Sequence, residues 1–174
     1  MIENKFLLAQ IFGFLAFFVS ILSVLQKHRS KYIYYNLAQN IFSCVQYYLL
    51  DKVIATYLTI ISVIRLIIYR FKEKYHIILY AFILIFFVSI NIIISILTFE
   101  NWYDIFPMVA STLVCFSVWQ SNVVFMKIIL IITKFLWGIY AVITRAYFSI
   151  AMDIFMIIWT IFYLIKQRKK LKYN

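Results

Sequence analysis

Polar side chains recur at helical spacing within one long apolar segment, residues 32–50. Intervals of three, four and seven residues place them on one face of a helix, as a stripe along its length. Amide and hydroxyl groups on such a stripe either bind a small solute or hold neighbouring helices together by hydrogen bonds. The sequence leaves both chemistries open. The stripe consists of Asn36, Gln39, Asn40, Ser43, Gln46 and Tyr47.

A second polar stripe lies 94 residues later, in the apolar segment 123–144, and it carries a charge. Lys134 is about ten residues from either end of that segment, roughly 15 Å deep at 1.5 Å per residue. Asp153 is about six residues, or ~9 Å, inside the next segment, so the long lysine side chain can reach it. We expect an ion pair, because a lone charge in hydrocarbon is costly. The second stripe consists of Thr133, Lys134, Trp137 and Tyr140.

Arg65 is the third charge inside an apolar segment, four or five residues from the end of 53–69. Snorkelling of the guanidinium to the membrane surface explains this position, and anion binding is the alternative. Trp137 is a candidate for stacking on a ring-bearing solute, with core packing as the alternative. Cys44 and Cys115 lack the spacing of metal ligands and are expected to be small buried packing residues.

Gly13 and Pro107 occupy equivalent places in two apolar segments, 94 residues apart. Either residue can bend a helix, which would serve a gate. A proline at the start of a helix is the alternative for Pro107. No metal site and no cofactor are expected, because the sequence holds no nucleotide loop, zinc motif, nucleophile elbow or paired carboxylate. We therefore expect a protein that is not an enzyme.

The segments that carry these residues are too apolar for a soluble domain. The chain has 174 residues, of which 66% are hydrophobic, and a soluble domain of this length could not bury that much apolar surface. Runs of about 20 apolar residues match the hydrocarbon core of a bilayer. The sequence therefore predicts an all-α integral membrane protein with seven transmembrane helices. The predicted spans are 6–25, 32–50, 53–69, 77–99, 105–120, 123–144 and 147–165.

The basic residues are divided unequally between the two faces of this arrangement. Of the 17 Lys and Arg, twelve fall on one face, three on the other and two inside the spans. By the positive-inside rule the C-terminus is cytoplasmic and the N-terminus is outside. The basic tail, 167–174, is expected to fix this topology and to contact anionic lipid. The net charge of +11 thus indicates membrane topology, and no nucleic-acid partner is expected.

An internal repeat is indicated by the tetrapeptide SVLQ at 23–26, which recurs as SVWQ at 117–120. The same offset superimposes the first three spans on the last three, without an insertion. The prediction is two parallel three-helix repeats, 5–72 and 100–166, joined by a linker helix at 76–99. A substrate site would lie between them near the midplane. The alternative is that evenly spaced apolar helices align by chance.

Several segments resemble the YgjV family of bacterial inner-membrane proteins: "LLAQIFGFLAFFVSILSV", "VIATYLTIISVIRLIIYRF" and "DIFPMVASTLVCFSVW". The shared features are an early "LAQ-x-x-G", the intramembrane Arg65, and Asp104 three residues before Pro107. This resemblance covers nearly the whole chain. It implies an inner-membrane location and a likeness to the wider group of PQ-loop proteins, sugar facilitators and nicotinamide riboside transporters. The chain departs from that group in lacking a Pro-Gln dipeptide and in having Lys134 where a neutral polar residue is expected.

The leading functional hypothesis is a small-solute transporter of the inner membrane that works by alternating access between the two repeats. The solute would be anionic or nucleoside-like, the other partners would be membrane lipids, and the protein would be a monomer or a homodimer. The alternative is a non-transporting membrane scaffold, or a protein that senses lipid or a partner. The predicted substrate-binding residues are Gln39, Asn40, Gln46, Arg65, Lys134, Trp137 and Asp153, with Gly13 and Pro107 as gating positions.

Overall fold

The computed structural model describes residues 2–24, 29–70, 77–119 and 123–172, and the described chain is helical apart from short turns. Helices satisfy every internal backbone N–H and C=O within one segment, as apolar surroundings demand. Some features of the sequence analysis lie outside the described residues: Gln26 and Gln120 of the repeated tetrapeptide, and the basic residues Lys27, Lys72 and Lys74.

Seven α-helices are present in the described chain, and each coincides with one predicted span. The bounds agree to within four residues at every end except the last, where α7 continues seven residues beyond 165. A short 3-10 helix, η2 (Trp102–Asp104), precedes α5. The helices are α1 (Ile2–Val24), α2 (Arg29–Leu49), α3 (Val53–Arg70), α4 (Ile77–Leu97), α5 (Ile105–Trp119), α6 (Val123–Ile143) and α7 (Tyr147–Lys172).

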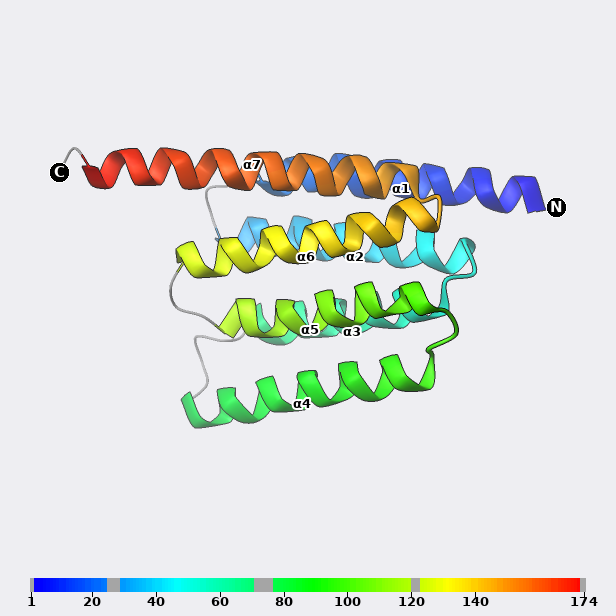
Figure 1. Ribbon diagram of the computed structural model, residues 1–174, viewed down its shortest axis with the longest axis horizontal. Coiled ribbons are helices and arrows are strands. Elements are labelled where there is room, and N and C mark those ends of the chain that lie inside the picture. Colours follow the sequence, from blue (N-terminus) through cyan, green and yellow to red (C-terminus); the bar gives the residue numbers. More distant parts are fainter. Residues whose placement is uncertain (1, 25–28, 71–76, 120–122, 173–174) are drawn as a thin grey trace.

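The helix axes run roughly along one direction, and the helices form two layers (Figure 1). One layer contains α1, α2 and α3, and the other contains α5, α6 and α7. Consecutive helices pack within each layer, and the contacts α1–α7 and α3–α5 join the layers at their two edges. These six helices therefore make a closed ring, and α4 lies outside it, against α3 and α5 (Figure 1).

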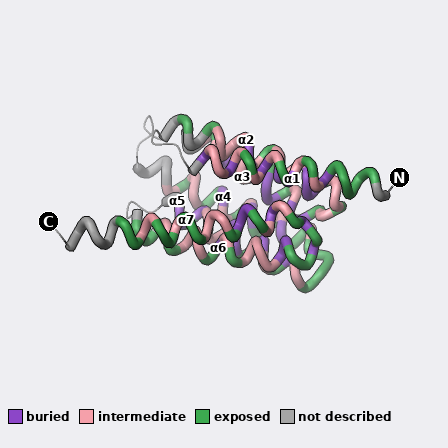
Figure 2. Tube along the Cα trace, turned by 90° about the horizontal axis from the view of Figure 1, so that it is seen from above, coloured by how far each residue is buried: buried purple, intermediate pink, exposed green. Residues whose placement is uncertain are grey.

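Buried residues lie mainly on the inner sides of the helices, and exposed residues lie mainly on the outer sides (Figure 2). Many large apolar side chains, such as Phe18, Phe82 and Ile158, are exposed on the outside. Within the described residues, two stretches are long and apolar enough to cross a membrane, Asn4–Ser23 and Tyr147–Lys166. Shorter apolar helices span Val53–Ile68 and Ala81–Leu97.

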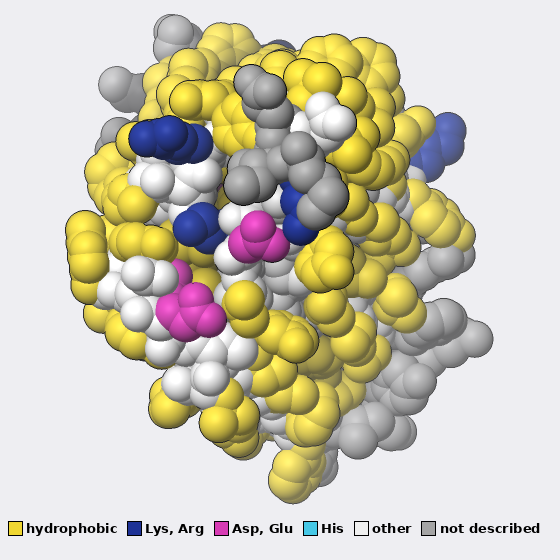
Figure 3. All heavy atoms as spheres, turned by 90° about the vertical axis from the view of Figure 1, so that its right-hand side faces the viewer, with side chains coloured by type: hydrophobic (Ala, Val, Ile, Leu, Met, Phe, Trp, Pro, Cys, Tyr) yellow, Lys and Arg dark blue, Asp and Glu magenta, His cyan; other side chains and the backbone are white. Residues whose placement is uncertain are grey.

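The turns after α2 and after α6 have the same construction. Asp51 has φ 55° and Arg145 has φ 57°, so each stands in the left-handed conformation that commonly ends a helix. The amide of Lys52 donates to the carbonyl of Tyr47 at 2.9 Å, and the amide of Ala146 donates to that of Ala141 at 2.9 Å. These bonds satisfy carbonyls that the helix end would otherwise leave free. Figure 3 shows this end of the molecule, where charged and polar side chains gather inside an apolar rim.

The two predicted gating positions lie in unbroken helical segments. α1 passes through Gly13 without interruption. Pro107 is the third residue of α5, where its missing N–H leaves no intrahelical bond unmade. Its place matches the helix-start interpretation, and the gating role of both residues stays a prediction.

Just upstream of α5, the buried carboxylate of Asp104 accepts hydrogen bonds from the amides of Glu100 (3.1 Å) and Asn101 (2.9 Å) and so fixes the turn into α5.

Candidate functional site

An ion pair joins α6 to α7 at the middle of the ring. Lys134 Nζ lies 2.9 Å from Asp153 Oδ1, and the side chains of Lys134 and Asp153 are 21% and 2% exposed. Lys134 is the twelfth of the 21 residues of α6, so it stands near the centre of the helix. This ion pair is the one that the positions of Lys134 and Asp153 in the sequence predict. The lysine supplies the counter-charge without which a buried carboxylate is costly.

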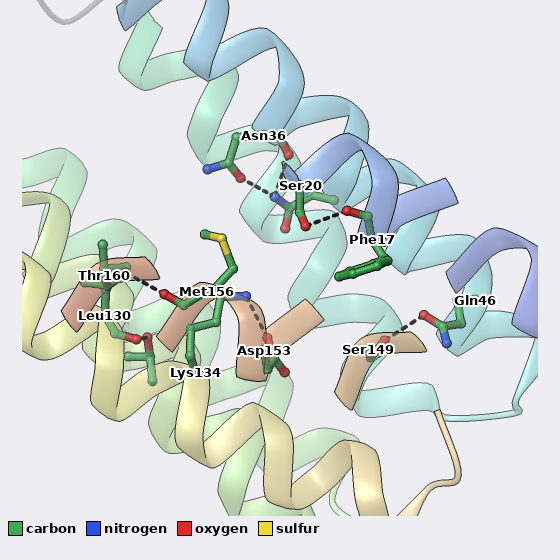
Figure 4. Close-up of polar contacts among 12 residues, drawn as sticks. Phe17, Ser20, Asn36, Gln46, Leu130, Lys134, Ser149, Asp153, Met156 and Thr160 are labelled. Atoms are coloured by element: carbon green, nitrogen blue, oxygen red, sulfur yellow. Dashed lines mark hydrogen bonds and ion pairs between the residues drawn. The ribbon is translucent and has the colours of Figure 1, made fainter. Parts of the chain in front are cut away.

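A second polar contact links α7 to α2 and uses the same face of α7. Ser149 is four residues before Asp153, so the two side chains project from one side of the helix. Ser149 Oγ donates to Gln46 Oε1 at 2.7 Å, and both residues are buried. Gln46 Nε2 is buried and has no hydrogen-bond partner in the described part of the chain. Figure 4 shows the Gln46–Ser149 bond and the Lys134–Asp153 pair side by side, at successive positions along α7.

Gly13 explains how the Gln46 side chain fits between α1 and α7. A Cβ atom placed on Gly13 would lie 2.5 Å from Gln46 Nε2 and 2.8 Å from Gln46 Cδ. These distances are shorter than van der Waals contact, so a Cβ at this point of α1 would displace the Gln46 amide from its present position. The structure therefore gives Gly13 a packing role that the sequence analysis did not consider.

Aromatic rings line the interface between α2 and α6 beside this polar cluster. The Tyr47 ring centroid is 5.7 Å from that of Trp137 and 6.0 Å from that of Tyr140. The Trp137 and Tyr140 rings meet edge to face at 6.0 Å, a favourable geometry for aromatic pairs. The buried hydroxyl of Tyr140 has no hydrogen-bond partner among the described residues. Trp137 is therefore part of a packed aromatic group.

Asn40 and Gln39 occupy the same helix as Gln46 but make different contacts. Asn40 Nδ2 donates to the backbone oxygen of Asn36 at 2.8 Å and to Asn36 Oδ1 at 2.9 Å. These bonds are local to α2 and do not cross to α6. Gln39 is buried. The structure therefore brings Gln46, Asp153, Lys134 and Trp137 together, while the Asn40 amide is bound along its own helix.

Arg65 belongs to a different cluster, between α3 and α5. Its Nη1 donates to Cys115 Sγ at 2.9 Å and to the Ser111 carbonyl at 3.5 Å, and its Nη2 donates to Ser62 Oγ at 3.3 Å. The residue is only 4% exposed, so its guanidinium is held inside the protein. The snorkelling interpretation of Arg65 is thus wrong, because the side chain does not extend to the surface.

Several polar partners in these clusters were not predicted from the sequence, among them Ser149 and Cys115. Ser149 stands one helical turn from Asp153, a spacing that would have identified it. Cys115 is buried, as expected, but its sulfur also accepts hydrogen bonds from Arg65 and from Asn91 Nδ2, the latter at 3.2 Å. No periodicity marks Cys115, because its partners come from helices far apart in the chain.

Comparison with known proteins gives one match. The family model Imp-YgjV, described as bacterial inner membrane protein, matches residues 7–170. The match spans all seven helices and every residue of the two clusters. No curated protein and no solved structure matches the chain. The comparisons therefore support the resemblance to the YgjV family and leave the likeness to PQ-loop proteins and sugar facilitators without support.

Proposed function

The chain belongs to the Imp-YgjV family of bacterial inner membrane proteins, and we propose that it is a small-solute transporter that crosses this membrane with seven helices. Transport would occur through the six-helix ring by alternating access between its two halves. The proposal includes the orientation expected from the basic residues, with the N-terminus outside and the C-terminus in the cytoplasm. No catalytic role is proposed.

The observation that carries the proposal is the polar cluster buried at the centre of the ring. Ionisable groups at membrane depth are rare and typically line the path of a solute or ion. Here Lys134 and Asp153 are paired, and beside them Gln46 offers an amide N–H that no described group uses. Buried donors without a partner cost free energy, and a bound solute would supply the missing acceptor.

The construction of the turns supports a division into two equivalent halves. Asp51 and Arg145, the non-glycine residues with positive φ in the described chain, are 94 residues apart. The backbone hydrogen bonds around them correspond at the same offset. In the first turn the amides of Leu50, Asp51 and Lys52 donate to the carbonyls of Gln46, Tyr48 and Tyr47, respectively. In the second turn the amides of Thr144, Arg145 and Ala146 donate to the carbonyls of Tyr140, Val142 and Ala141. Evenly spaced apolar helices do not require identical turns, so chance alignment is the weaker explanation.

Packing and burial are consistent with the same division. At the offset of 94, α3 corresponds to α7 and α5 corresponds to α1. The α3–α5 contact therefore has the α7–α1 contact as its equivalent, and both contacts are present. Nine pairs of equivalent positions are buried in both halves and come from all three helix pairs, whereas other positions, such as Ser43 and its equivalent Trp137, are buried in one half alone. The nine pairs are Gly13 and Pro107, Ala16 and Ala110, Ser23 and Ser117, Gln39 and Thr133, Gln46 and Tyr140, Tyr47 and Ala141, Ala55 and Ser149, Leu58 and Met152, and Thr59 and Asp153.

The proposed roles follow from the chemistry of each side chain. Lys134 would bind an anionic group of the solute, and Asp153 would hold the lysine when the solute is absent. The Gln46 amide would donate to a polar atom of the solute, and Trp137 would contact an apolar or ring-bearing part. Gln39 and Asn40 would line the path along α2, at the positions that correspond to Thr133 and Lys134 in the second half.

Cysteine accessibility along α2 tests whether the ring encloses an aqueous path. In a variant with Cys44→Ala and Cys115→Ser, single cysteines replace Gln39, Ser43 or Gln46, which are 6%, 5% and 0% exposed. The matched controls replace Ile41 and Tyr48, which are 45% and 69% exposed on the outer side of the same helix. We expect a small water-soluble thiol reagent to label the three inner positions and not the two outer ones. Protection of all five positions in the membrane would contradict the proposal.

Uptake measurements test the role of Lys134 once a solute is identified. A thermal-shift screen of the purified protein against anionic metabolites and nucleosides identifies ligands, because binding to the folded state stabilises it. We expect proteoliposomes to accumulate the stabilising solute, and Lys134→Met to abolish most of the uptake. Unchanged uptake by Lys134→Met would remove the lysine from the proposed site.

A membrane scaffold remains the second candidate, on one specific observation. The polar groups of the ring bond directly to each other, as in the Ser149–Gln46 contact between α7 and α2. Such bonds between membrane helices contribute about 1 kcal/mol each and hold bundles together. The scaffold predicts that every inner position of α2 is protected from the thiol reagent, so the accessibility experiment separates the two functions.

A further inference from the structure

Arg65 is a buried cation whose described partners are all uncharged. The guanidinium of α3 donates to a thiol, a hydroxyl and a backbone carbonyl, on Cys115, Ser62 and Ser111. Among the described residues no carboxylate forms an ion pair with it; the pair found there is Lys134 with Asp153. A buried charge without a counter-charge destabilises a protein by several kcal/mol. The described part of the chain thus leaves Arg65 without a negative charge beside it.

One edge of the Arg65 guanidinium is left to bind a negatively charged group. Nη1 is occupied by the bonds to α5, whereas Nε is buried and has no partner in the described chain. Nη2, which forms the same edge as Nε, has one long bond of 3.3 Å to Ser62 Oγ. The Nε–Nη2 edge is the side on which arginine binds anions with two parallel hydrogen bonds.

The linker helix α4 closes this region from outside the ring. Asn91 of α4 is buried, and its Nδ2 donates to Cys115 Sγ at 3.2 Å and to the Phe87 carbonyl at 2.8 Å. α4 packs against both α3 and α5 and against no other helix to a comparable extent. The site is thus walled by three helices; its residues Arg65, Asn91, Ser111 and Cys115 are 0–4% exposed, and Ser62 is half-buried. A ligand that reaches it must be small.

We propose that the α3–α4–α5 interface binds a small monovalent anion of the size of chloride beside Arg65. This site is separate from the Lys134–Asp153 cluster, whose ion pair joins α6 to α7, and it does not depend on transport. The position of Arg65 corresponds at the offset of 94 to Trp159, so the second half has no equivalent. The anion would neutralise the guanidinium and hold α4 against the ring.

Thermal unfolding of the purified full-length protein tests the site with chloride as the probe. Unfolding is followed in detergent by tryptophan fluorescence, with potassium chloride exchanged for potassium gluconate at constant ionic strength. We expect chloride to raise the Tm by about 5 °C at saturation, since ligand at 100 times its Kd stabilises by ~2.7 kcal/mol and ~1 kcal/mol shifts the Tm by a few degrees. A Tm that is the same in both salts would overturn the proposal.

Variants assign the effect to Arg65. Arg65→Met is expected to lose the chloride response, and Lys52→Met, which removes a cation outside both clusters, is expected to keep it. Should Arg65→Met fail to fold, Arg65→Lys provides the measurement, because a lysine retains the charge but lacks the two-donor edge. Its half-saturating chloride concentration is expected to rise at least about tenfold, which corresponds to ~1.4 kcal/mol. An unchanged chloride response in Arg65→Lys, or its loss in Lys52→Met, would contradict the assignment.

Two further arms exclude other counter-charges. If the thiolate of Cys115 neutralised Arg65, the unmodified protein would not respond to chloride and Cys115→Ser would, and that pattern overturns the anion site. If a lipid phosphate filled it, added phosphatidylglycerol would stabilise the protein in gluconate, and chloride would not. We expect chloride to act in the unmodified protein and in Cys115→Ser, without added anionic lipid.

Discussion

At the scale of single residues, the Lys134–Asp153 pair allows a sharp test because its two members are unequally buried. The carboxylate is 2% exposed and the lysine 21%. Lys134→Met leaves a fully buried negative charge and is expected to lower the free energy of unfolding by about 3–5 kcal/mol. Asp153→Asn leaves a lysine that can still extend toward the surface, so its loss is expected to be smaller. Denaturation with SDS in mixed micelles measures both values.

The double variant Lys134→Met with Asp153→Leu serves as the control for this prediction. Replacing both members of a buried ion pair by apolar residues is often neutral, whereas removing one is costly. We therefore expect the double variant to be more stable than Lys134→Met alone. If the loss in the free energy of unfolding of the double variant equalled the sum of the losses for each residue alone, the two residues would stabilise the fold independently, despite the 2.9 Å between Nζ and Oδ1.

The two glycines of the chain form a matched pair for a second test. A Cβ on Gly13 would overlap the Gln46 amide, whereas a Cβ on Gly138 would come no closer than 3.9 Å, to Asp153 Cβ. Gly13→Ala is expected to destabilise by about 1–3 kcal/mol through displacement of that side chain. Gly138→Ala is expected to be neutral or to stabilise by ~0.5–1 kcal/mol, because it lowers the backbone entropy of the unfolded chain.

Shortening Gln46 distinguishes crowding at Gly13 from other effects. In the double variant Gly13→Ala with Gln46→Ala, the added methyl group no longer meets the amide. The further loss caused by Gly13→Ala is then expected to fall below ~0.5 kcal/mol by the same unfolding measurement. If Gly13→Ala costs as much with Gln46→Ala as without it, the close approach of Gln46 is not the reason for the glycine.

The residue-scale contacts differ in how far the sequence could predict them. The Lys134–Asp153 pair was predictable, because the two helices are joined by a short turn and a lysine side chain is long enough to span the difference in depth between the two residues. The Ser149–Gln46 bond was not, since it joins α7 to α2 across 103 residues and requires the ring to close. The burial of Arg65 also depends on α3 meeting α5, a contact that no periodicity encodes. The sequence therefore predicts contacts between consecutive helices, and it does not predict contacts that depend on the closure of the six-helix ring.

At the scale of secondary-structure elements, the turns after α2 and α6 place residues with side chains where glycine is favoured. The left-handed conformation costs most residues about 1 kcal/mol and costs glycine almost nothing. Arg145→Gly is therefore expected to stabilise by ~1 kcal/mol. Asp51→Gly is expected to gain less, because aspartate tolerates this conformation better than arginine.

The same positions give a control by substitution with a branched residue. Arg145→Val is expected to destabilise, because a β-branched side chain is poorly tolerated at positive φ. The Tm of each variant in detergent provides the comparison. If Arg145→Gly and Arg145→Val changed the Tm alike, the φ of 57° at Arg145 would not govern the stability of this turn.

Helix bounds were predictable because polar residues interrupt the apolar runs at nearly every helix end. The pair Asp51 and Lys52, for example, separates α2 from α3. The end of α7 was not predictable from hydropathy, since the helix continues to Lys172 through a basic segment. Lysine, arginine and glutamine are good helix formers, and outside the hydrocarbon they need no apolar surroundings. Hydropathy locates a span, and helix propensity decides how far the helix extends beyond it.

At the scale of the whole molecule, the sequence predicted which helices follow each other in a half but not how the halves meet. The offset of 94 implies equivalent contacts within each layer, and α1–α2 with α5–α6 are such a pair. The position of α4 outside the ring could not be predicted, because a linker has no counterpart in the repeat. Its contacts with α3 and α5 give it a role in covering the Arg65 cluster.

The orientation of the whole molecule provides the last prediction. The turns at Asp51 and Arg145 lie at the same end as the N-terminus (Figure 1). The proposed parallel repeats, with few basic residues at this end, would place both turns outside. In a variant with Cys44→Ala and Cys115→Ser, single cysteines at Asp51 or Arg145 are expected to react with a membrane-impermeant maleimide on intact cells from which the outer membrane has been removed. A cysteine at Lys166, near the opposite end of α7, is expected to react only after lysis. Labelling of Asp51→Cys and Arg145→Cys only after lysis would reverse the orientation, and labelling of one without the other would contradict parallel repeats.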